Sequence, residues 1–307
     1  MIGIVILNYE TYVKTIECVD SILNTYHEKI NIYIVDNKSL NDSFEILSKK
    51  YKLYSFIKVI QATSNEGFAR GNNLGLKECQ KDGCTYVILS NNDILYCDNS
   101  IEYMKKFIID NKDAVIVGPK LYKPNMEIQR STTLKKMSLL DFFGLAQVLP
   151  SHSKSTILDE ENLKEAVEVY SVSGCCFIVN LQRFFEIGAF DEGTFLYNEE
   201  NILSMQVSLS PYKTYFLPIS KIIHSHGATT GKQNMFVNGE LLKSGLYYWK
   251  KYRKCHNFIL ISIWGYFTLR WLLKATYSKE LRSGWLNYIR TSLKALYSEI
   301  LSKYPSL

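Results

Sequence analysis

The stretch YVILSNNDI, residues 86–94, joins a continuous apolar run to three polar residues. Apolar runs such as residues 86–89 are typical of strands that are buried on both faces, as in a parallel sheet. Asn91, Asn92 and Asp93 are poor strand formers, because their short polar side chains compete for nearby backbone groups. We therefore expect the strand to end here, either in an ordinary polar turn or at an edge of the sheet that faces a ligand.

Similar apolar runs recur along the first part of the chain, and segments with helical spacing lie between them. Apolar stripes run from Tyr12 to Leu23 and from Ile101 to Ile108. Strand and helix in alternation predict an α/β fold with an open, mostly parallel sheet, and the pattern after Asn234 predicts a C-terminal helical extension. The expected strands are residues 2–7, 31–35, 56–60, 85–89, 114–117, 170–179 and 212–217, with an irregular excursion over residues 119–165.

Polar residues follow each of four predicted strands. The carboxyl ends of parallel strands meet at one edge of the sheet, and ligands of open α/β folds bind beyond that edge. One polar strand end is ordinary, but four together favour a polar ligand. The four ends are Asn8-Tyr9, Asp36-Asn37, residues 64–67 and residues 91–93.

The first of these turns argues against a dinucleotide site. That site would need GxGxxG after the first strand, whereas residues 8–12 contain no glycine, and no phosphate loop of the GxxxxGK[ST] type occurs. Glycines appear later, in NEGFARGNNLG, where Gly67, Gly71 and Gly75 lie four apart and share one helix face. Close approach to a ligand and tight packing of a helix on the sheet both explain this spacing.

Composition places the chain among ordinary globular proteins, since 47% of its 307 residues are hydrophobic and 21% are charged. The seven cysteines are an odd number without a CxxC pair, which favours free thiols in a reducing compartment over a disulfide framework or a zinc site. The chain begins with an apolar run and no basic leader, so a secretory signal is not expected. We therefore expect a cytoplasmic protein.

The positive charge is concentrated at the C-terminal end. Residues 236–307 hold 12 Lys and Arg against 3 Asp and Glu, whereas residues 1–235 hold 24 and 27. This asymmetry points to an anionic surface as partner, and no nucleic-acid recognition motif accompanies it. The apolar run from Phe258 has 12 uncharged residues before Arg270, fewer than the ~18 of a membrane span, so we expect a helix lying in the membrane interface. A helical cap on the domain and a homodimer contact remain alternatives.

A set of short motifs runs through the first three quarters of the chain: residues 4–9, Val35-Asp36-Asn37 with Ser39, residues 65–73, 89–93, 173–176, 190–192, 195–200, and His224-Ser225-His226. Their order and spacing resemble family 2 inverting glycosyltransferases, especially the rhamnosyltransferase-like branch that builds bacterial surface polysaccharides. The likeness covers about residues 1–230, and the motifs in combination are highly specific.

The resemblance implies a GT-A fold, with a Rossmann-like sheet in a catalytic domain over residues 1–234. The nucleotide-sugar half would end near residue 118, the acceptor half would cover about 119–234, and residues 235–307 would form a basic, aromatic-rich helical region. It also implies metal-dependent, inverting transfer of a hexosyl or deoxyhexosyl group from dTDP-rhamnose or a UDP-sugar. The acceptor would be a glycan on a polyprenyl diphosphate, in capsule, O-antigen or cell-wall synthesis at the inner face of the membrane.

The resemblance also assigns residues to the donor. Asp93 matches the last acidic position of the family's metal motif, which suits Mn²⁺ or Mg²⁺, whereas Asn91 replaces the first aspartate of the fuller motif. His224 matches a histidine near the diphosphate, as a neutral metal ligand or as an imidazolium paired with phosphate. Asp36 resembles the aspartate that accepts a hydrogen bond from a pyrimidine N–H. The implied donor-binding residues are Asn8, Tyr9, Asp36, Asn65, Gly67, Arg70, Gly71, Asn72, Asn91, Asn92 and Asp93.

An inverting transfer needs a base that deprotonates the acceptor hydroxyl. Alignment on Phe195-Leu196-Tyr197 places Glu200 at the family's catalytic aspartate, and the neighbouring Glu199 is the second candidate. Glutamate is one methylene longer than aspartate, and reactive geometry is sensitive to about 1 Å. We favour Glu200 as the base.

Two other functions remain open. A sugar nucleotidyltransferase also places a nucleotide on a parallel sheet, but it would carry a glycine-rich signature that residues 8–12 lack. The departures at Asn91 and Glu200 leave room for a catalytically silent nucleotide-sugar-binding protein.

Overall fold

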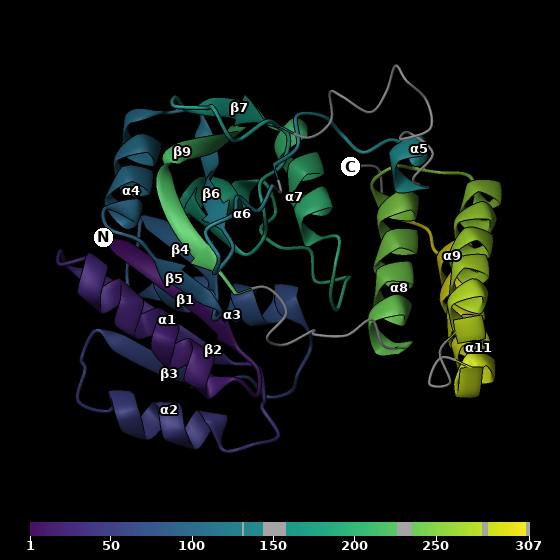
Figure 1. The fold of residues 1–307 in the computed structure, drawn as a ribbon, viewed down its shortest axis with the longest axis horizontal. Helices are drawn as coiled ribbons and strands as arrows, with labels where there is room; N and C mark the ends of the chain where they lie inside the picture. Colours follow the sequence, from purple (N-terminus) through teal and green to yellow (C-terminus); the bar gives the residue numbers. More distant parts are fainter. Residues whose placement is uncertain (131, 144–157, 226–234, 278–281, 305–307) are drawn as a thin grey trace.

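The computed structural model describes residues 1–130, 132–143, 158–225, 235–277 and 282–304 (Figure 1). Within these ranges, one nine-stranded sheet forms the centre of the fold, in the order β3-β2-β1-β4-β8-β6-β9-β5, with β7 beside β9. The strands are β1 (Ile2–Asn8), β2 (Ile30–Asp36), β3 (Ile57–Gln61), β4 (Tyr86–Asn91), β5 (Ile94–Tyr96), β6 (Ala114–Tyr122), β7 (Val167–Val169), β8 (Cys176–Asn180) and β9 (Lys213–His224).

The first four strands are parallel, and their carboxyl ends are level. Asn8 is paired with Asp36, and Leu7 with Asn91, so the polar strand ends meet at one edge, as the sequence predicts. β8 is antiparallel to both β4 and β6, whereas β6 and β9 are parallel to each other. This arrangement confirms the expected α/β fold with a central sheet and C-terminal helices.

Two apolar cores hold the helices against opposite faces of this sheet. Ile4 and Ile6 of β1 pack on one face with helices α1, α2 and α4, and Val5 packs on the other face with α3, α6 and α7. Alternate residues of β1 face opposite cores, which explains its continuous apolar sequence. The helices are α1 (Tyr12–Thr25), α2 (Ser43–Tyr51), α3 (Phe68–Lys81), α4 (Ser100–Asp110), α5 (Leu139–Phe142), α6 (Leu181–Glu186) and α7 (Glu199–Ser208).

The glycines of α3 bring this helix unusually close to β1. A Cβ atom on Gly75 would lie 2.4 Å from Val5 Cγ1, and one on Gly71 would lie 2.4 Å from Leu7 Cδ1. Of the two explanations for the glycine spacing, packing on the sheet therefore applies to Gly71 and Gly75. Gly67 differs, because it precedes the helix with a φ of 95°.

Several strand boundaries differ from those predicted. The run at residues 170–179 is not one strand, because β7 ends at Val169 and β8 begins at Cys176, with a polar, glycine-containing segment between them. β9 is longer than expected and continues to His224, and the short strand β5 was not predicted. β6 continues past Val117 to Tyr122, and its pairing with β9 shifts in register between Pro119 and Lys120.

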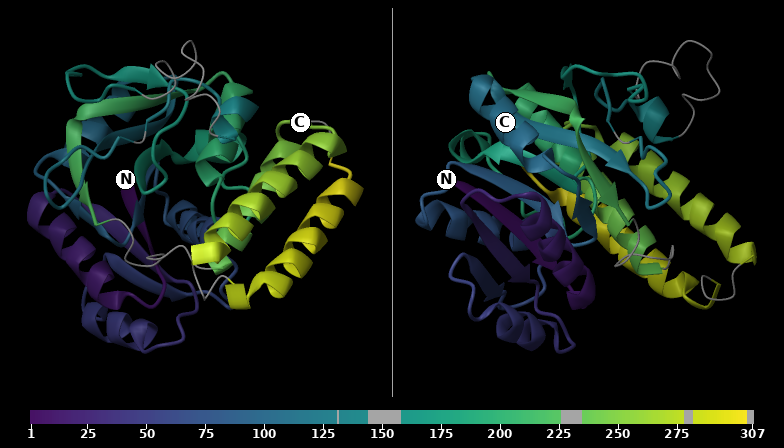
Figure 2. Two further views of the ribbon diagram at one scale, coloured as in Figure 1. Left: turned by 45° about the vertical axis from the view of Figure 1, so that its right-hand side comes forward. Right: turned by 60° about the vertical axis from the view of Figure 1, so that its left-hand side comes forward.

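Among the described residues, three long C-terminal helices pack together beside the sheet-bearing part (Figures 1 and 2). They are α8 (Met235–Lys251), α9 (Asn257–Tyr277) and α11 (Trp285–Leu301), and they share an apolar cluster that includes Ile202 and Met205 of α7. α9 has 21 residues and is long and apolar enough to cross a membrane by length and composition. The helix continues beyond the uncharged run of residues 258–269 through Arg270 and Lys274, and its place in the membrane interface stays a prediction.

Candidate active site

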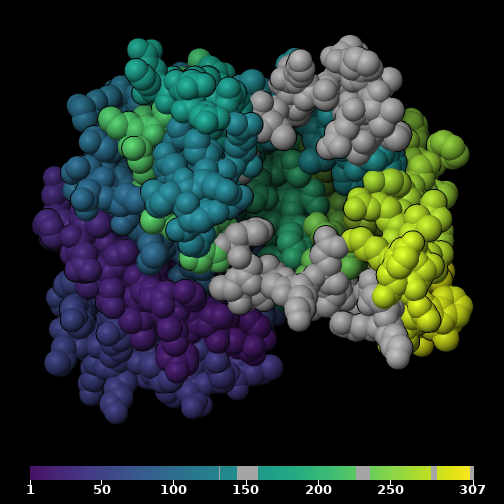
Figure 3. Space-filling model, viewed as in Figure 1, coloured from purple at the N-terminus to yellow at the C-terminus, as the bar shows by residue number. Residues whose placement is uncertain are grey.

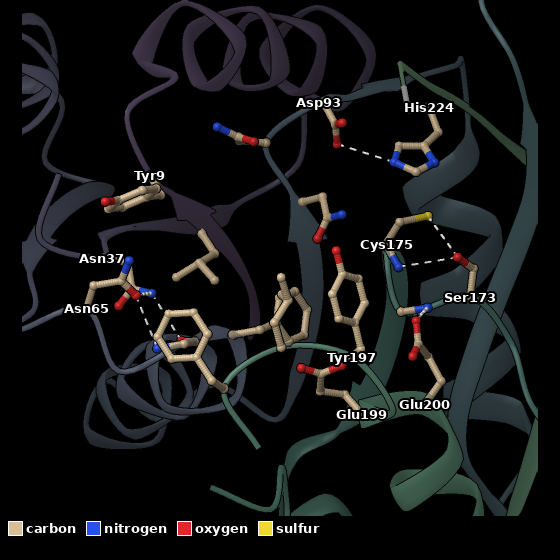
Figure 4. A pocket seen from close by; sticks show the side chains of 18 of the residues that line it. Tyr9, Asn37, Asn65, Asp93, Ser173, Cys175, Tyr197, Glu199, Glu200 and His224 are labelled. Carbon is tan, nitrogen blue, oxygen red and sulfur yellow. Dashed lines mark hydrogen bonds and ion pairs between the residues drawn. The ribbon is translucent and has the colours of Figure 1, made fainter. Parts of the chain in front are cut away.

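A cavity of about 710 Å³ lies beyond the carboxyl ends of β1, β2 and β4. Figure 4 shows Tyr9, Asn37 and Asn65 on one side of it, Asp93 with His224 on another, and Glu199 with Glu200 on a third. These groups come from segments that are far apart in the sequence. The space-filling view shows that the surface is also hollowed between the sheet-bearing part and the C-terminal helices (Figure 3).

The side of the cavity formed by β1 and β2 presents an aromatic ring and an amide. Tyr9 follows β1 and Asn37 follows β2, and both line the cavity. Asn37 Nδ2 donates to Asn65 Oδ1 at 2.9 Å and to the carbonyl oxygen of Gly67 at 3.1 Å, which fixes the orientation of the amide. No described residue donates a hydrogen bond to Asn37 Oδ1, so this oxygen can accept one from a ligand.

Asp36 lies beneath the cavity rather than in its wall. Its side chain is fully buried, Oδ1 accepts from the Ser39 backbone N–H at 3.0 Å, and Oδ2 accepts from Ser39 Oγ at 2.6 Å and from Asn8 Nδ2 at 2.8 Å. Asn8 Oδ1 in turn accepts from Thr15 Oγ1 at 2.7 Å. These contacts form a polar network that joins the ends of β1 and β2 to α1.

Asp93 and His224 form the second side of the cavity. Asp93 Oδ1 lies 3.4 Å from His224 Nε2, and both side chains are buried. Gln129 Oε1 lies 3.1 Å from the other ring nitrogen of His224. Burial opposes the charged imidazole, but hydrogen bonds with Asp93 and Cys175 outweigh it and raise the pKa of His224 to about 10.

This pair fits a divalent cation that is shared with a diphosphate. Among the residues described, no group of three or more His, Cys, Asp or Glu side chains could hold a metal ion by itself. A shared site needs fewer protein ligands, because one or two carboxylates commonly hold Mg²⁺ together with phosphate oxygens and water. Asp93 Oδ1 is buried, and the contact that the described residues give it is the ion pair with His224, which leaves the oxygen able to bind a cation as well.

Two adjacent carboxyl groups with different surroundings form the third side. Glu199 is 7% exposed, and its Oε1 has no hydrogen-bond partner within the described parts of the chain. Burial and the neighbouring Glu200 raise the pKa of Glu199 to about 8. Glu200 is less buried, and its Oε1 accepts a hydrogen bond from the Gly174 backbone N–H at 3.2 Å. The raised pKa of Glu199 therefore favours its protonated form at neutral pH.

A strained turn leads into these carboxyl groups. Tyr197 and Asn198, immediately before α7, have φ values of 75° and 67°. The left-handed conformation costs a residue with a Cβ atom about 1–2 kcal/mol. Phe195, just before the turn, accepts a hydrogen bond from the Phe68 N–H at 2.8 Å, and a Cβ on Gly67 would lie 2.1 Å from the Phe195 carbonyl oxygen. Gly67 is therefore needed both for its positive φ and for this close approach.

A sequence model of the family described as Glycosyl transferase family 2 matches residues 2–180, more than half of the chain. The chain belongs to glycosyl transferase family 2. Rhamnosyltransferase WbbL of Escherichia coli K12 is 23% identical over 231 residues, which cover 73% of this chain and 83% of that relative. N-acetylglucosaminyl-diphospho-decaprenol L-rhamnosyltransferase of Mycobacterium tuberculosis is 25% identical over 152 residues, or 48% of this chain and 49% of the relative. The match therefore spans about half the length of the mycobacterial protein.

Solved structures share the fold at low sequence identity. Mannosyltransferase PcManGT from Pyrobaculum calidifontis, in complex with GDP-Man and Mn²⁺, superposes with a TM-score of 0.57 at 10% identity over 98% of this chain and 86% of that one. GalNAc-T7 with UDP, GalNAc and Mn²⁺ superposes with a TM-score of 0.55 at 17% identity over 73% of this chain and 43% of that one. Together with the family match, these structural likenesses establish the GT-A fold.

The predicted site residues divide into those that line the cavity and those that support it. Arg70 lies outside the cavity and forms ion pairs with Glu66 and Glu192. Gly71 packs on β1, and Asn72 Nδ2 donates to the Phe68 carbonyl oxygen within α3. His226 lies outside the described residues. The predicted residues that line the cavity are Tyr9, Asn65, Gly67, Asn91, Asn92, Asp93, Glu199, Glu200 and His224, whereas Asn8, Asp36, Arg70, Gly71 and Asn72 do not.

The sequence prediction missed Asn37 and Tyr197 as cavity residues. Asn37 belongs to the motif Val35-Asp36-Asn37, in which the resemblance assigns the base contact to Asp36. Successive side chains of a strand point to opposite sides, so only one of two neighbours at a strand end can face the ligand. That alternation was the available signal.

Proposed function

We propose that this protein is an inverting glycosyltransferase that moves a sugar from a nucleoside-diphosphate donor to a hydroxyl of a glycan. The observation that carries the proposal is the meeting of three groups in one cavity: the Tyr9–Asn37 side, the buried pair Asp93 and His224, and the adjacent Glu199 and Glu200. An aromatic ring with an amide suits a nucleobase, a buried carboxylate beside an imidazole suits a cation–diphosphate group, and a carboxylate pair suits proton transfer. The proposed catalytic unit is residues 1–234, divided near residue 118.

The nucleobase of the donor is proposed to lie at the carboxyl ends of β1 and β2. Tyr9 offers an aromatic face for stacking, and Asn37 Oδ1 offers the acceptor for a pyrimidine N–H. In this proposal Asn37 replaces Asp36, whose oxygens are used by Ser39 and Asn8. A dTDP-sugar or UDP-sugar fits this arrangement, because thymine and uracil both present such an N–H.

The diphosphate is proposed to lie against Asp93 and His224. A divalent cation, when bound there, would neutralise charge on the leaving diphosphate. Asp93 Oδ1 would hold it, and His224, as the imidazolium that its raised pKa indicates, would pair with a phosphate oxygen. Asn91 and Asn92 line the same side, and Asn92 Nδ2 is fixed by Thr11 Oγ1 at 2.7 Å.

Glu200 is proposed to remove the proton from the acceptor hydroxyl as the hydroxyl attacks the anomeric carbon. Its carboxylate lines the cavity and is oriented by the Gly174 N–H. A Cβ atom on residue 174 would lie 2.5 Å from Glu200 Oε1, so Gly174 makes room for the longer glutamate. Glu199, held largely protonated by burial, is proposed to donate a hydrogen bond to a substrate hydroxyl instead.

The acceptor is proposed to be a lipid-linked glycan reached from the cytoplasmic side of a membrane. The name of the mycobacterial relative describes a rhamnosyl transfer to a decaprenol-linked acceptor. Phe258, Leu273 and Leu286 are exposed on α9 and α11, whose sequences also carry basic residues. α9 buries Leu260, Ile263 and Trp271 in the helical cluster, so we propose that it lies along the membrane surface. A homodimer through the same exposed side chains is the alternative.

A panel of nucleotide sugars with and without Mn²⁺ or Mg²⁺ tests the proposed function. We expect one pyrimidine nucleoside-diphosphate sugar to raise the melting temperature of the protein in a metal-dependent manner. The protein should hydrolyse this sugar nucleotide slowly and transfer its sugar rapidly to the correct acceptor. Binding without any turnover would instead favour a catalytically silent binding protein. Absence of binding to every nucleotide sugar would contradict the proposal.

A further inference from the structure

Asp191, at the start of the segment that leads to the carboxyl pair, accepts hydrogen bonds from helix α8 and from Tyr252, the residue that follows it. Its oxygens accept from Tyr247 Oη at 2.9 and 2.8 Å, from Lys251 Nζ at 2.7 Å, and from Tyr252 Oη. The Gly193 backbone N–H also donates to it at 2.9 Å. Burial opposes the charged form of Asp191, but the hydrogen bonds from Lys251 and Tyr252 outweigh it and lower its pKa.

The ammonium group of Lys251 contacts aromatic rings as well as the carboxylate of Asp191. Lys251 Nζ lies 5.1 Å from the ring centre of Tyr247, 5.3 Å from that of Tyr252 and 5.8 Å from that of Tyr304. A Cβ atom on residue 193 would lie 2.1 Å from Tyr247 Oη, so Gly193 is required for this docking. An ion pair whose polar atoms are hydrogen-bonded and partly buried holds the two segments that it joins more firmly than an exposed ion pair does.

The far end of the same segment is also tied to α8. Asn198 Nδ2 donates to Ser244 Oγ at 3.0 Å, and Ile202 and Met205 of α7 pack in one cluster with Leu242 and Leu246. α8 therefore contacts the segment before and after the turn at Tyr197. On the other side, α3 holds it through Asn73 Nδ2, which donates to the Phe190 carbonyl oxygen and to Glu192 Oε1, each at 2.9 Å.

The turn between these two contacts is strained, since Tyr197 and Asn198 both have positive φ. Such conformations persist only where surrounding contacts enforce them, and they gather at functional sites. We propose that α8 is a working part of the transfer site, in which Asp191, Lys251 and Ser244 act as positioning residues that hold the turn and thereby aim Glu199 and Glu200. This inference rests on the proposed function and assigns to the C-terminal region a role beyond membrane contact.

Lys251→Met and Ser244→Ala test this inference in the full chain. Lys251→Met removes the ammonium while keeping a long side chain, and Ser244→Ala removes only the hydroxyl that binds Asn198. Lys243→Met is the matched control, because Lys243 is on the same helix and pairs only with Glu240 among the contacts described. Lys251→Arg keeps the charge and should restore function. Donor affinity, transfer turnover, melting temperature and hydrogen exchange of residues 194–203 are measured for each.

We expect both test variants to lower kcat by roughly tenfold or more with donor Kd changed less than about twofold, because displacement of a catalytic group by about 1 Å has effects of this size. Hydrogen exchange of residues 194–203 should become faster in the two test variants, while that of α3 should not change. In the control variant, hydrogen exchange of both regions should stay as in the unaltered protein. Unaltered kcat and exchange in folded Lys251→Met and Ser244→Ala would overturn the inference, even where Glu200→Gln abolishes transfer and so supports the proposed function. Absence of donor turnover by the unaltered protein would instead overturn both.

Discussion

Asp93 Oδ1 lies 3.4 Å from His224 Nε2 at the edge of the cavity. The two residues meet because β5 follows Asp93 directly and is antiparallel to β9, with Ile94 level with His224. The carboxylate and the imidazole therefore face the same space as an ion pair. We propose this edge as the place where the donor diphosphate binds with its cation.

Asp93→Asn should weaken donor binding and transfer together, because the carboxylate would hold the cation before and during the reaction. The amide keeps the volume but loses the charge that a hard cation prefers. Calorimetry with nucleotide in the presence and absence of Mn²⁺ checks this without an acceptor. A variant whose nucleotide affinity still rises with Mn²⁺ as in the unaltered protein would remove Asp93 from the cation site.

Asn37→Ala should weaken nucleotide binding by about 0.5–1.5 kcal/mol, the usual worth of a neutral hydrogen bond. Asp36→Asn should act on the fold instead, because its carboxylate joins Asn8 to Ser39 beneath the cavity. We expect Asp36→Asn to lower the free energy of unfolding and to leave nucleotide affinity nearly unchanged in the folded protein. Weaker nucleotide binding by Asp36→Asn in calorimetry, with an unchanged free energy of unfolding in chemical denaturation, would show that Asp36 contacts the nucleobase.

Glu199→Gln should change how stability depends on pH. Burial raises the pKa of Glu199 to about 8 from an ordinary 4.5, so the folded protein binds this proton more tightly than the unfolded chain. The stability that this proton supplies is present below the ordinary pKa and is lost as pH rises toward 8, by on the order of a few kcal/mol. The glutamine variant should therefore gain melting temperature relative to the unaltered protein between pH 5 and pH 8.5. Equal pH slopes would show that Glu199 is not a buried acid.

The parallel sheet and its ligand edge were predictable because continuous apolar runs and polar strand ends are local features. Asn8 and Asp36 show where local reasoning stops. Both end a strand at the expected edge, yet their side chains turn into a buried network, and Asn37 takes the place in the cavity wall. Which of two neighbouring residues faces a ligand depends on strand register, which the sequence does not show.

The contacts of α8 were beyond reach for a different reason. Asp191 and Lys251 are joined by tertiary packing across a long stretch of sequence, and neither residue belongs to a pattern that indicates the other. The positive φ of Tyr197 and Asn198 was equally hidden, because neither is glycine. The division of the chain at residue 234 and the membrane contact stay predictions.

The C-terminal helices should bind anionic vesicles more strongly than neutral ones. Exposed Phe258, Leu273 and Leu286 supply apolar contact, and each basic residue near the surface contributes about 1 kcal/mol at low salt. Binding to phosphatidylglycerol vesicles should fall as salt rises, since exposed charges are screened. Equal partitioning to neutral and anionic vesicles, or none to either, would favour the homodimer, which sedimentation would then detect.

Comparison of Glu200→Gln with Glu199→Gln tests the central claim of base-assisted glycosyl transfer most directly. Donor Kd and transfer turnover are measured for both variants with the same nucleotide sugar and acceptor. Glu200→Gln keeps the volume and loses the proton acceptor, so donor Kd should hold while turnover falls by roughly 10²–10⁴. Glu199→Gln should lose less, because its carboxyl is already largely protonated. Full transfer by Glu200→Gln would contradict the account.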